Sequence, residues 1–457
     1  MRENRRVRPW SGIALFLCLV PALVSAADSS RLHEPSGQQA WIPSPGDTFS
    51  TYVSNNEARI RAVLEQLYFA DSAQADRGQG PLPQGGSSDC GSEPCSRSTP
   101  AEPFGPGLIV DQVVQMRSTY EILPNQAACA ASGAEDRLGF LLIHGLTDSP
   151  YLLRSVARSL TERYPCALVR GLLLPGHGTV PGDSLAMQHE EWLAVTRFGV
   201  ESFRGQVESL FLVGYSTGTS LSLRHVDAHR DDDLISGLIM FAPALASTSR
   251  LAFLTQYMRW FADWLGTPEA ERDAAKYESF SLNAGAEFYQ LTKPLTRANF
   301  TPLTVPVFMA GTGDDTTVNM EAARTFFCTK APQDRRRMLW YRAQATSSDP
   351  SALCPGIEVV AAESPEHRVY SLSHTSITTP PEDAHYGLDG RYSICLHYGA
   401  DSADFNTCMN DDTQTVYGER NLISEGRYNG KWVRRGSFNP HYEQMLEEVV
   451  GFIDDNR

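Results

Sequence analysis

The 457-residue sequence has fewer positively than negatively charged residues, and this excludes several classes of protein. Lys and Arg number 39 against 54 Asp and Glu, which gives a net charge of −15. So acidic a chain repels nucleic acid and anionic membrane surfaces, and we expect neither as a partner. The sequence also lacks the H-E-x-x-H, P-loop and dinucleotide fingerprints. We therefore expect no metal and no cofactor.

Long apolar runs are also scarce, since only "SGIALFLCLVPALV" near the N-terminus qualifies. It follows a basic start, precedes small residues around Ala26, and is short for a bilayer span, so it predicts a signal peptide at residues 1–26. An uncleaved anchor is the alternative. Cleavage would remove four arginines and one glutamate and change the net charge to −18. We expect an exported protein, periplasmic or extracellular, with no stable membrane insertion.

Cysteine is present in an even number once the signal peptide is removed. Of nine cysteines only Cys18 lies in that segment, and eight paired cysteines suit an exported chain. The order of the eight cysteines along the chain suggests one set of disulfide pairings, which we state as a hypothesis. The expected bridges are Cys90–Cys95, Cys129–Cys166, Cys328–Cys354 and Cys395–Cys408.

The chain alternates short apolar runs with helical patterns. Residues 27–137 hold an expected helix at 51–69 and a Gly/Pro/Ser-rich linker, and residues 138–457 form the main domain. Alternation of this kind predicts an α/β fold, a mostly parallel central sheet with helices on both faces. The expected strands are 138–145, 166–178, 209–214, 235–244, 305–311 and 367–373, and the last helix is 441–453. Residues 247–302 and 375–440 are too long to be simple connections, and we interpret them as additions to the α/β domain.

Ser216 lies in "FLVGYSTGTS", between Gly214 and Gly218, directly after a strand and before a helix. This context is the one that a nucleophile elbow requires, in which a tight turn lifts a serine above the sheet. An oxyanion hole needs two N–H donors. We expect them from Thr217, after the nucleophile, and from Leu146, in the loop "HGLTDSP".

Other motifs have plainer readings. "GDSL" at 182–185 resembles the signature of an esterase family that carries this motif near the start of its domain. Here it lies far from the start of the domain, which argues against Ser184 as a nucleophile. We expect His144 to fix the shape of its loop, and His177 in "PGHG" to belong to a turn.

Together, "LLIHGLTDSP", "LLLPGHGTVP", "LVGYSTG" and "GTGDDTTV" resemble the α/β-hydrolase fold, over roughly residues 138–380 and the last helix. They are most similar to the monoglyceride lipase and carboxylesterase branch, often labelled serine aminopeptidase-like. The N-terminal hundred residues and the insertion before the last helix lie outside the resemblance.

The resemblance implies the chain order nucleophile, acid, histidine. The acid follows "VPVFMAG", where Asp314 and Asp315 both qualify. The family places its acid three residues before a small apolar residue, which favours Asp315 with Val318.

The histidine lies downstream, and His374 is favoured because it follows the strand-like "RVYSLS". The competing positions are His367, His385, His397 and His441. The 375–440 insertion departs from the family pattern, in which the last helix follows the histidine closely.

The segment 251–265 carries Trp260 and Phe261 among other aromatic residues at helical spacing. Such a helix is either core or, because this fold inserts a cap there, the lining of an acyl pocket. Trp260 and Phe261 are thus the candidate substrate-binding residues of a helical cap.

The sequence is therefore interpreted as a serine hydrolase that cleaves a small-molecule ester or lipid with an apolar acyl group. Two alternatives remain open. A peptidase would need an acidic group in the pocket to hold a substrate amine, and a non-catalytic binding protein could use the same fold. The oligomeric state is not predicted.

Overall fold

The computed structural model describes most of the chain. The described residues are 31–68, 104, 108–132, 137–268, 271–297, 300–343, 354–400, 402–424 and 426–457. The predicted signal peptide and the Cys90–Cys95 bridge lie outside these ranges.

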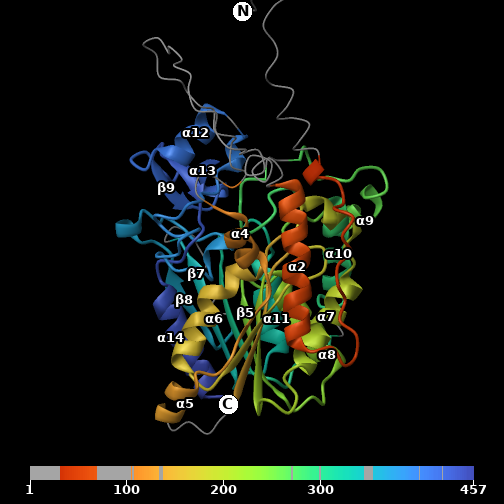
Figure 1. Cartoon of the computed structure of the whole chain (residues 1–457). Coiled ribbons are helices and arrows are strands. Elements are labelled where there is room, and N and C mark those ends of the chain that lie inside the picture. The colour runs from red at the N-terminus through yellow and green to blue at the C-terminus, as the bar shows by residue number, and fades with distance from the viewer. Residues whose placement is uncertain are drawn as a thin grey trace, which may run out of the picture.

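An eight-stranded sheet forms the centre of the molecule (Figure 1), in the order β1-β3-β2-β4-β5-β6-β7-β8. Only β1 is antiparallel to its neighbour, and every later pairing is parallel. The strands are β1 Tyr120–Ile122, β2 Leu138–Ile143, β3 Leu168–Leu172, β4 Ser209–Tyr215, β5 Ile235–Phe241, β6 Val307–Thr312, β7 Arg336–Arg342 and β8 Ile357–Ala361. The mostly parallel sheet expected from the sequence is confirmed.

The last strand was placed wrongly by the sequence pattern. Residues 367–373 contain no extended strand, and Val369 makes only isolated bridges. The sheet instead ends with β7 and β8. Only Ile357 of β8 is buried, and its other positions are exposed or half-buried, because β8 is the edge strand. His374 therefore follows a loop that leaves β8 at Ala361.

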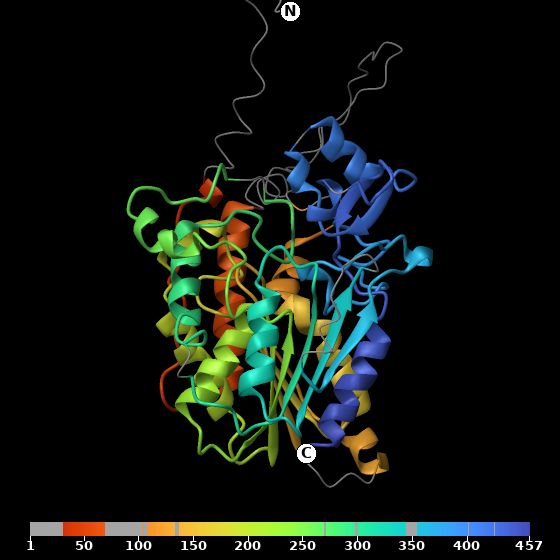
Figure 2. The ribbon, with the colours of Figure 1, turned by 180° about the vertical axis from the view of Figure 1, so that it is seen from behind.

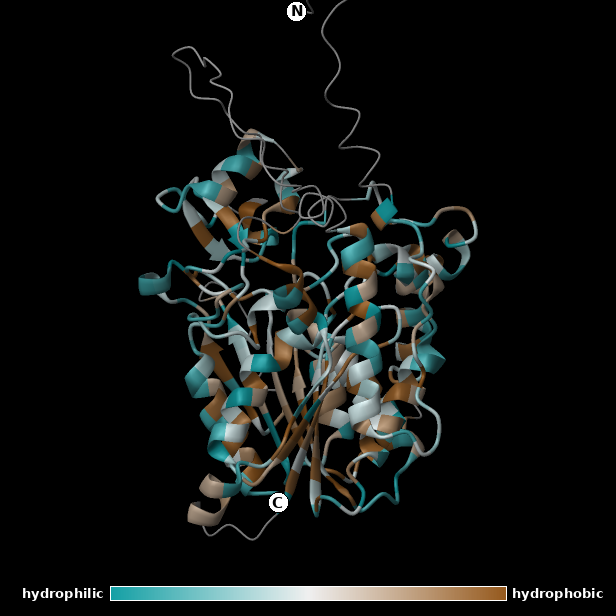
Figure 3. Ribbon diagram, viewed as in Figure 1, coloured by the Kyte–Doolittle hydropathy of each residue, from teal (hydrophilic) through white to brown (hydrophobic). Residues whose placement is uncertain are grey.

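Helices cover both faces of the sheet, as Figures 1 and 2 show from opposite sides. Buried side chains alternate along the strands and divide into two clusters. One cluster includes Phe140 and Phe211 and packs against α6 and α14, while the other includes Leu141 and Leu212 and packs against α7, α8 and α11. The bounds are α6 Arg154–Arg163, α7 His189–Glu201, α8 Thr217–Ala228, α11 Met320–Lys330 and α14 Tyr442–Asp454. Apolar residues run along the strands in Figure 3.

The N-terminal region packs onto this layered core. α2 (Phe49–Leu67) confirms the helix expected at 51–69, and α4 (Val110–Arg117) and α5 (Gln126–Ser132) follow it. Phe49 and Tyr52 of α2 join one core cluster, whereas Ile60 and Leu64 join the other. The Tyr52 hydroxyl bonds both the N–H and the C=O of Leu173, just after β3.

The two long additions lie at the end of the sheet toward which the parallel strands point (Figure 2). The first holds α9 (Thr255–Met258) and α10 (Leu282–Thr292), which pack against each other. The second holds α12 (Ala403–Asn410), α13 (Asn421–Ser424) and the parallel pair β9 (Thr415–Gly418) and β10 (Trp432–Arg435). Among the described residues, no helix is long and apolar enough to cross a membrane.

Candidate active site

Ser216 makes the turn between β4 and α8 by itself, because β4 ends at Tyr215 and α8 begins at Thr217. Its φ of 51° lies in the left-handed region that non-glycine residues rarely occupy. The flanking glycines are required sterically. A Cβ at Gly214 would lie 2.6 Å from the Thr219 nitrogen, and one at Gly218 would lie 1.9 Å from the Ile143 oxygen. The turn has the strained geometry of a nucleophile elbow.

His374 joins the serine to an aspartate. Its Nε2 lies 2.9 Å from Ser216 Oγ, and its Nδ1 lies 2.6 Å from Asp315 Oδ2. The Tyr215 hydroxyl also donates to the His374 carbonyl oxygen at 3.1 Å. The structure thus brings together the serine, histidine and aspartate favoured by the sequence, although His374 comes from a loop and not from the end of a strand.

The two neighbouring aspartates have different partners. The second carboxyl oxygen of Asp315 accepts hydrogen bonds from the N–H groups of Thr317 (2.7 Å) and Val318 (3.0 Å). Burial alone would raise the pKa of Asp315, but the facing His374 and these bonds hold that pKa below its ordinary value. Asp314 instead accepts a bond from the Ala343 N–H at 2.9 Å, so it ties this turn to the end of β7.

The competing histidines do not reach Ser216. His385 is buried against Asp273, with Nε2 2.8 Å from Oδ1. His367 bonds the Ser364 hydroxyl, and His441 precedes α14. His397 lines the cavity beside the serine, but it shares no hydrogen bond with Ser216.

The loop after β2 supplies the second side of the site. Leu146 and Thr217 both line the cavity next to Ser216. Thr217 opens α8, so its N–H has no acceptor within that helix. His144 Nε2 accepts from the Leu174 N–H at 3.0 Å, and His177 Nε2 accepts from the Thr147 N–H at 3.1 Å. Both histidines therefore hold loops in place, and burial lowers the pKa of His144 to about 4.

The cavity above Ser216 has a volume of about 370 Å³. Part of its wall is apolar and comes from both additions, namely from Phe280, Phe288, Ile394 and Leu396. Another part is charged. Asp148, Asp273, Lys276, Glu278, Arg420 and Arg435 also line it. The cavity is therefore an amphipathic space next to a nucleophile, which suits a ligand with both apolar and polar groups.

Trp260 and Phe261 do not line this cavity, so the prediction that they bind substrate there is wrong. α9 ends at Met258 after little more than one turn, and the chain then folds through turns that direct these two side chains outward. Trp260 is 76% exposed and Phe261 is 91% exposed. They are not core residues either.

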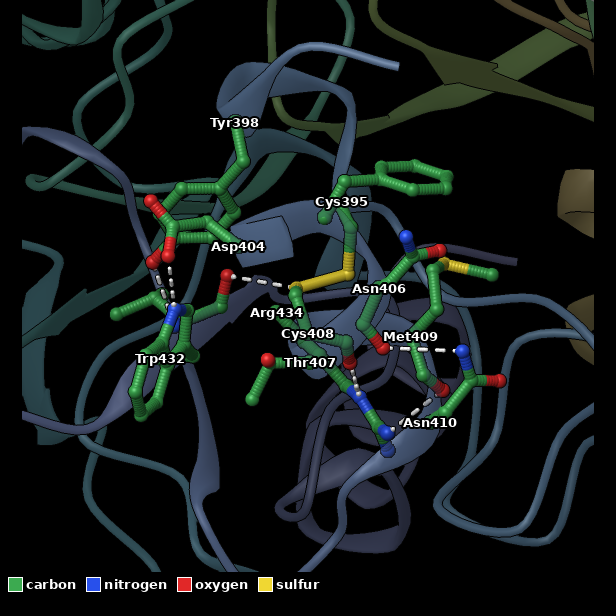
Figure 4. Close-up of a disulfide and its surroundings, with 12 residues drawn as sticks. Cys395, Tyr398, Asp404, Asn406, Thr407, Cys408, Met409, Asn410, Trp432 and Arg434 are labelled. Carbon is green, nitrogen blue, oxygen red and sulfur yellow. Dashed lines mark hydrogen bonds between the residues drawn. A yellow bond between two sulfur atoms is a disulfide. The ribbon is translucent and has the colours of Figure 1, made fainter. Parts of the chain in front are cut away.

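The 375–440 insertion forms a wall of the site. Ile394, Leu396 and His397 flank Cys395, which is bonded to Cys408 of α12. Figure 4 shows this disulfide with Arg434 of β10, whose guanidinium donates to the carbonyl oxygens of Cys408 (2.8 Å) and Met409 (3.0 Å). The described residues also contain the predicted Cys129–Cys166 and Cys328–Cys354 bridges. These three pairings are confirmed.

The charged residues of the cavity were missed by the sequence reasoning. Asp148 precedes the Ser149 that caps the following turn, and an acid within the expected oxyanion loop "HGLTDSP" was a usable signal. Lys276 and Glu278 belong to an addition without a recognisable motif. Their proximity to Ser216 depends on the fold.

One group of potential metal ligands lies elsewhere. His189, Glu190 and Glu287 offer donor atoms within 4.8 Å of one another. However, Arg259 Nη1 already lies 2.5 Å from Glu287 Oε1, and His189 contacts the other oxygen. A fixed guanidinium in this set disfavours a cation, so we assign no metal site to these residues.

Comparison with known proteins identifies the family. Residues 140–380 match the alpha/beta hydrolase family. The chain belongs to this family. It is also 30% identical over 95 residues to a thermostable monoacylglycerol lipase of Bacillus sp. (strain H-257), a match that covers 21% of this chain and 37% of the lipase. The chain thus spans little more than a third of the length of that relative.

Three solved structures of other proteins are similar to about half of this alpha/beta hydrolase, at low sequence identity. A soluble variant of monoglyceride lipase from Saccharomyces cerevisiae is 14% identical, with a TM-score of 0.38, and the match covers 49% of this chain and 82% of that chain. The monoacylglycerol lipase of Paleococcus ferrophilus is 18% identical, with a TM-score of 0.37 and coverage of 49% and 88%. Est1E from Butyrivibrio proteoclasticus, solved with ferulic acid bound, is 18% identical, with a TM-score of 0.35 and coverage of 49% and 84%.

Proposed function

We propose that the protein is a serine hydrolase that cleaves carboxylic esters through an acyl-enzyme. The observation that carries the proposal is the unbroken contact chain from Ser216 Oγ through both ring nitrogens of His374 to Asp315. Such an arrangement lets a histidine accept the hydroxyl proton while the carboxylate orients the ring and stabilises its charged form.

In the proposed reaction, Ser216 Oγ attacks the ester carbonyl carbon as His374 takes its proton. The N–H groups of Leu146 and Thr217 stabilise the resulting oxyanion, and the dipole of α8 adds to this effect. The tetrahedral intermediate collapses as His374 returns the proton to the leaving alcohol. A water molecule, activated by the same histidine, then releases the carboxylic acid and restores the serine.

The proposed substrate is a small ester or lipid with an apolar acyl group. Phe280, Phe288, Ile394 and Leu396 give the cavity the apolar surface that an acyl chain would cover. The partial similarity to a monoacylglycerol lipase supports the same class. Export is part of the proposal, because three disulfides among the described residues suit an oxidising compartment.

The test compares variants on a short nitrophenyl ester. Ser216→Ala should abolish turnover, and a fluorophosphonate should label Ser216 in the unaltered protein. Ser184→Ala is the matched control, since Ser184 is buried in the 181–186 turn and does not line the cavity. Labelling at Ser184, or full activity in Ser216→Ala, would reject the proposal.

A further inference from the structure

Asp148 places a buried carboxyl group beside the nucleophile. The residue is 6% exposed and lines the cavity that contains Ser216 and His374. Gly145 shows how close it lies. A Cβ built on Gly145 would be 2.5 Å from Asp148 Oδ2 and 3.0 Å from Ser216 Cβ, so both side chains border the same small space. A group bound to Asp148 would therefore lie only a few bonds from the scissile carbonyl.

This carboxyl group has no hydrogen-bond donor among the side chains and N–H groups of the described residues. Its one ion-pair contact is a long one, with Oδ1 3.9 Å from Lys276 Nζ. A buried carboxylate without hydrogen bonds is costly to the fold. A cost of this kind is typical of groups retained for a ligand.

The other acids of the cavity already have partners. Asp273 contacts His385 and Tyr386, and Glu278 contacts Tyr392 and backbone N–H groups. His385, Tyr386 and Tyr392 come from the 375–440 insertion, which therefore holds the acidic loop at 271–278 in place over the site. Asp273 adds negative potential to the cavity, whereas burial raises the pKa of Glu278 to about 8, so that Glu278 is mostly uncharged at neutral pH. Asp148 is the acid left available for a ligand.

The arginines that line the cavity do not neutralise the negative charge of Asp148. Arg435 Nε lies 3.0 Å from Glu419 Oε1, and the same guanidinium also bonds the Thr317 hydroxyl. Its charge is matched by that buried glutamate. Arg420 is exposed on the insertion.

Building on the proposed ester hydrolysis, we infer that Asp148 binds an ammonium group of the substrate. The substrate class is a carboxylic ester that carries a cationic nitrogen within a few bonds of the scissile carbonyl. The ammonium would replace the distant Lys276 contact with a direct charge-assisted hydrogen bond. The adjoining apolar wall would hold the uncharged part of the molecule.

The test uses two pairs of esters that differ in charge and little in shape. On the acyl side, the nitrophenyl ester of alanine is compared with that of 2-methylpropanoic acid. On the alcohol side, 2-(dimethylamino)ethyl acetate, whose protonated nitrogen carries an N–H, is compared with 3-methylbutyl acetate. The quantity measured is the ratio of kcat/KM for the cationic ester to that for the neutral ester. Intrinsic reactivity cancels when this ratio is compared between protein variants.

Asp148→Asn should lower this ratio about tenfold or more in at least one pair. Lys276→Gln should raise the ratio, because it removes the cation that competes for Asp148. An unchanged ratio in both variants and both pairs would overturn the inference. Failure of the unaltered protein to hydrolyse the neutral esters would instead reject the proposed function, so the two failures are distinguishable.

A competition experiment on the unaltered protein covers the case in which Asp148→Asn does not fold. Ethylammonium chloride should inhibit hydrolysis of the neutral nitrophenyl ester competitively, and propanol at the same concentration should inhibit less. Equal inhibition would contradict the inference. A lactate ester that depends on Asp148 as strongly as the alanine ester does would also overturn it, because the carboxyl group would then recognise a hydroxyl.

Discussion

At the scale of single residues, the adjacent Asp314 and Asp315 have separate tasks. Asp315 faces His374 Nδ1, whereas Asp314 accepts the Ala343 N–H. Asp315→Asn should lower kcat by about 10⁴-fold, because the asparagine amide can hold His374 in the wrong tautomer. Asp314→Asn should leave most activity. Steady-state kinetics on the neutral nitrophenyl ester measures both effects.

Thermal unfolding of both aspartate variants provides the control. Asp315→Asn should unfold close to the unaltered protein, so that its loss of activity is chemical. An active Asp315→Asn together with an inactive Asp314→Asn would mean that the two residues exchange roles.

The pKa of Asp148 predicts a pH-dependent cost to the fold. Burial raises this pKa from 3.8 to about 6, with smaller opposing effects of Lys276 and His374. The folded state thus favours the protonated acid, so the cost is absent below about pH 4 and grows as pH rises through 6. Asp148→Asn should therefore increase the free energy of unfolding at pH 8 by up to about 3 kcal/mol, and change it little at pH 4.

Urea unfolding at the two pH values checks this prediction. Asp231→Asn, at an exposed aspartate, is the control and should change the unfolding free energy little at either pH. A gain in stability that is equal at pH 4 and pH 8 would contradict the assigned cause, because an uncharged packing effect does not depend on pH.

The local sequence was sufficient to predict Ser216, since the glycines and the strand–turn–helix pattern act within a few residues. Asp315 and His374 needed the resemblance to a family, because nothing local distinguishes His374 from His385. The environment of Asp148 could not be read from sequence at all. Its cavity is closed by loops more than a hundred residues away, which only the folded chain brings together.

At the scale of elements, the 251–265 segment shows how periodicity can mislead. Helical spacing of aromatic residues implies a buried face only if the helix continues, and α9 ends at Met258. β7 was missed because the arginines of "RRMLWYR" mask its apolar centre. The segment "HRVYSLS" has the alternation of a strand but makes only isolated bridges. Local patterns thus identified the central strands and missed the later ones.

Exposure of Trp260 and Phe261 predicts small effects of substitution. Trp260→Ser and Phe261→Ser should each change the unfolding free energy by at most about 0.5 kcal/mol, since neither side chain is buried. The preference among esters of different acyl length should also stay unchanged. Phe288→Ala, which alters the cavity wall, is the positive control. Losses of about 3–5 kcal/mol at Trp260 would indicate a core position instead.

At the scale of the whole molecule, the three disulfides differ in their distance from the reaction. Cys395–Cys408 lies next to cavity residues, whereas Cys328–Cys354 joins α11 to the segment that precedes β8. Replacing Cys395 and Cys408 with Ser should destabilise the fold by about 2–4 kcal/mol and raise KM. The matched Cys328/Cys354 double variant should lose comparable stability with little change in KM. Unfolding curves and kinetics at 25 °C test both.

Peptide mapping without reduction provides a separate check on the pairings. It should find Cys129–Cys166, Cys328–Cys354 and Cys395–Cys408 as linked peptides. Free thiols at these six positions would contradict both the pairings and the proposed export.

Helix α2 contributes to both core clusters, and this has a consequence for dividing the chain. A fragment of residues 108–457 would expose the apolar surface that Ile60, Val63 and Leu64 cover. It would also remove the Tyr52 hydroxyl that accepts a hydrogen bond from the Leu173 N–H. Such a fragment should aggregate when it is produced alone. A synthetic peptide of residues 31–68, supplied in trans, should bind that surface and restore a soluble, active complex. The hydrolase could then be switched on by the addition of one helix.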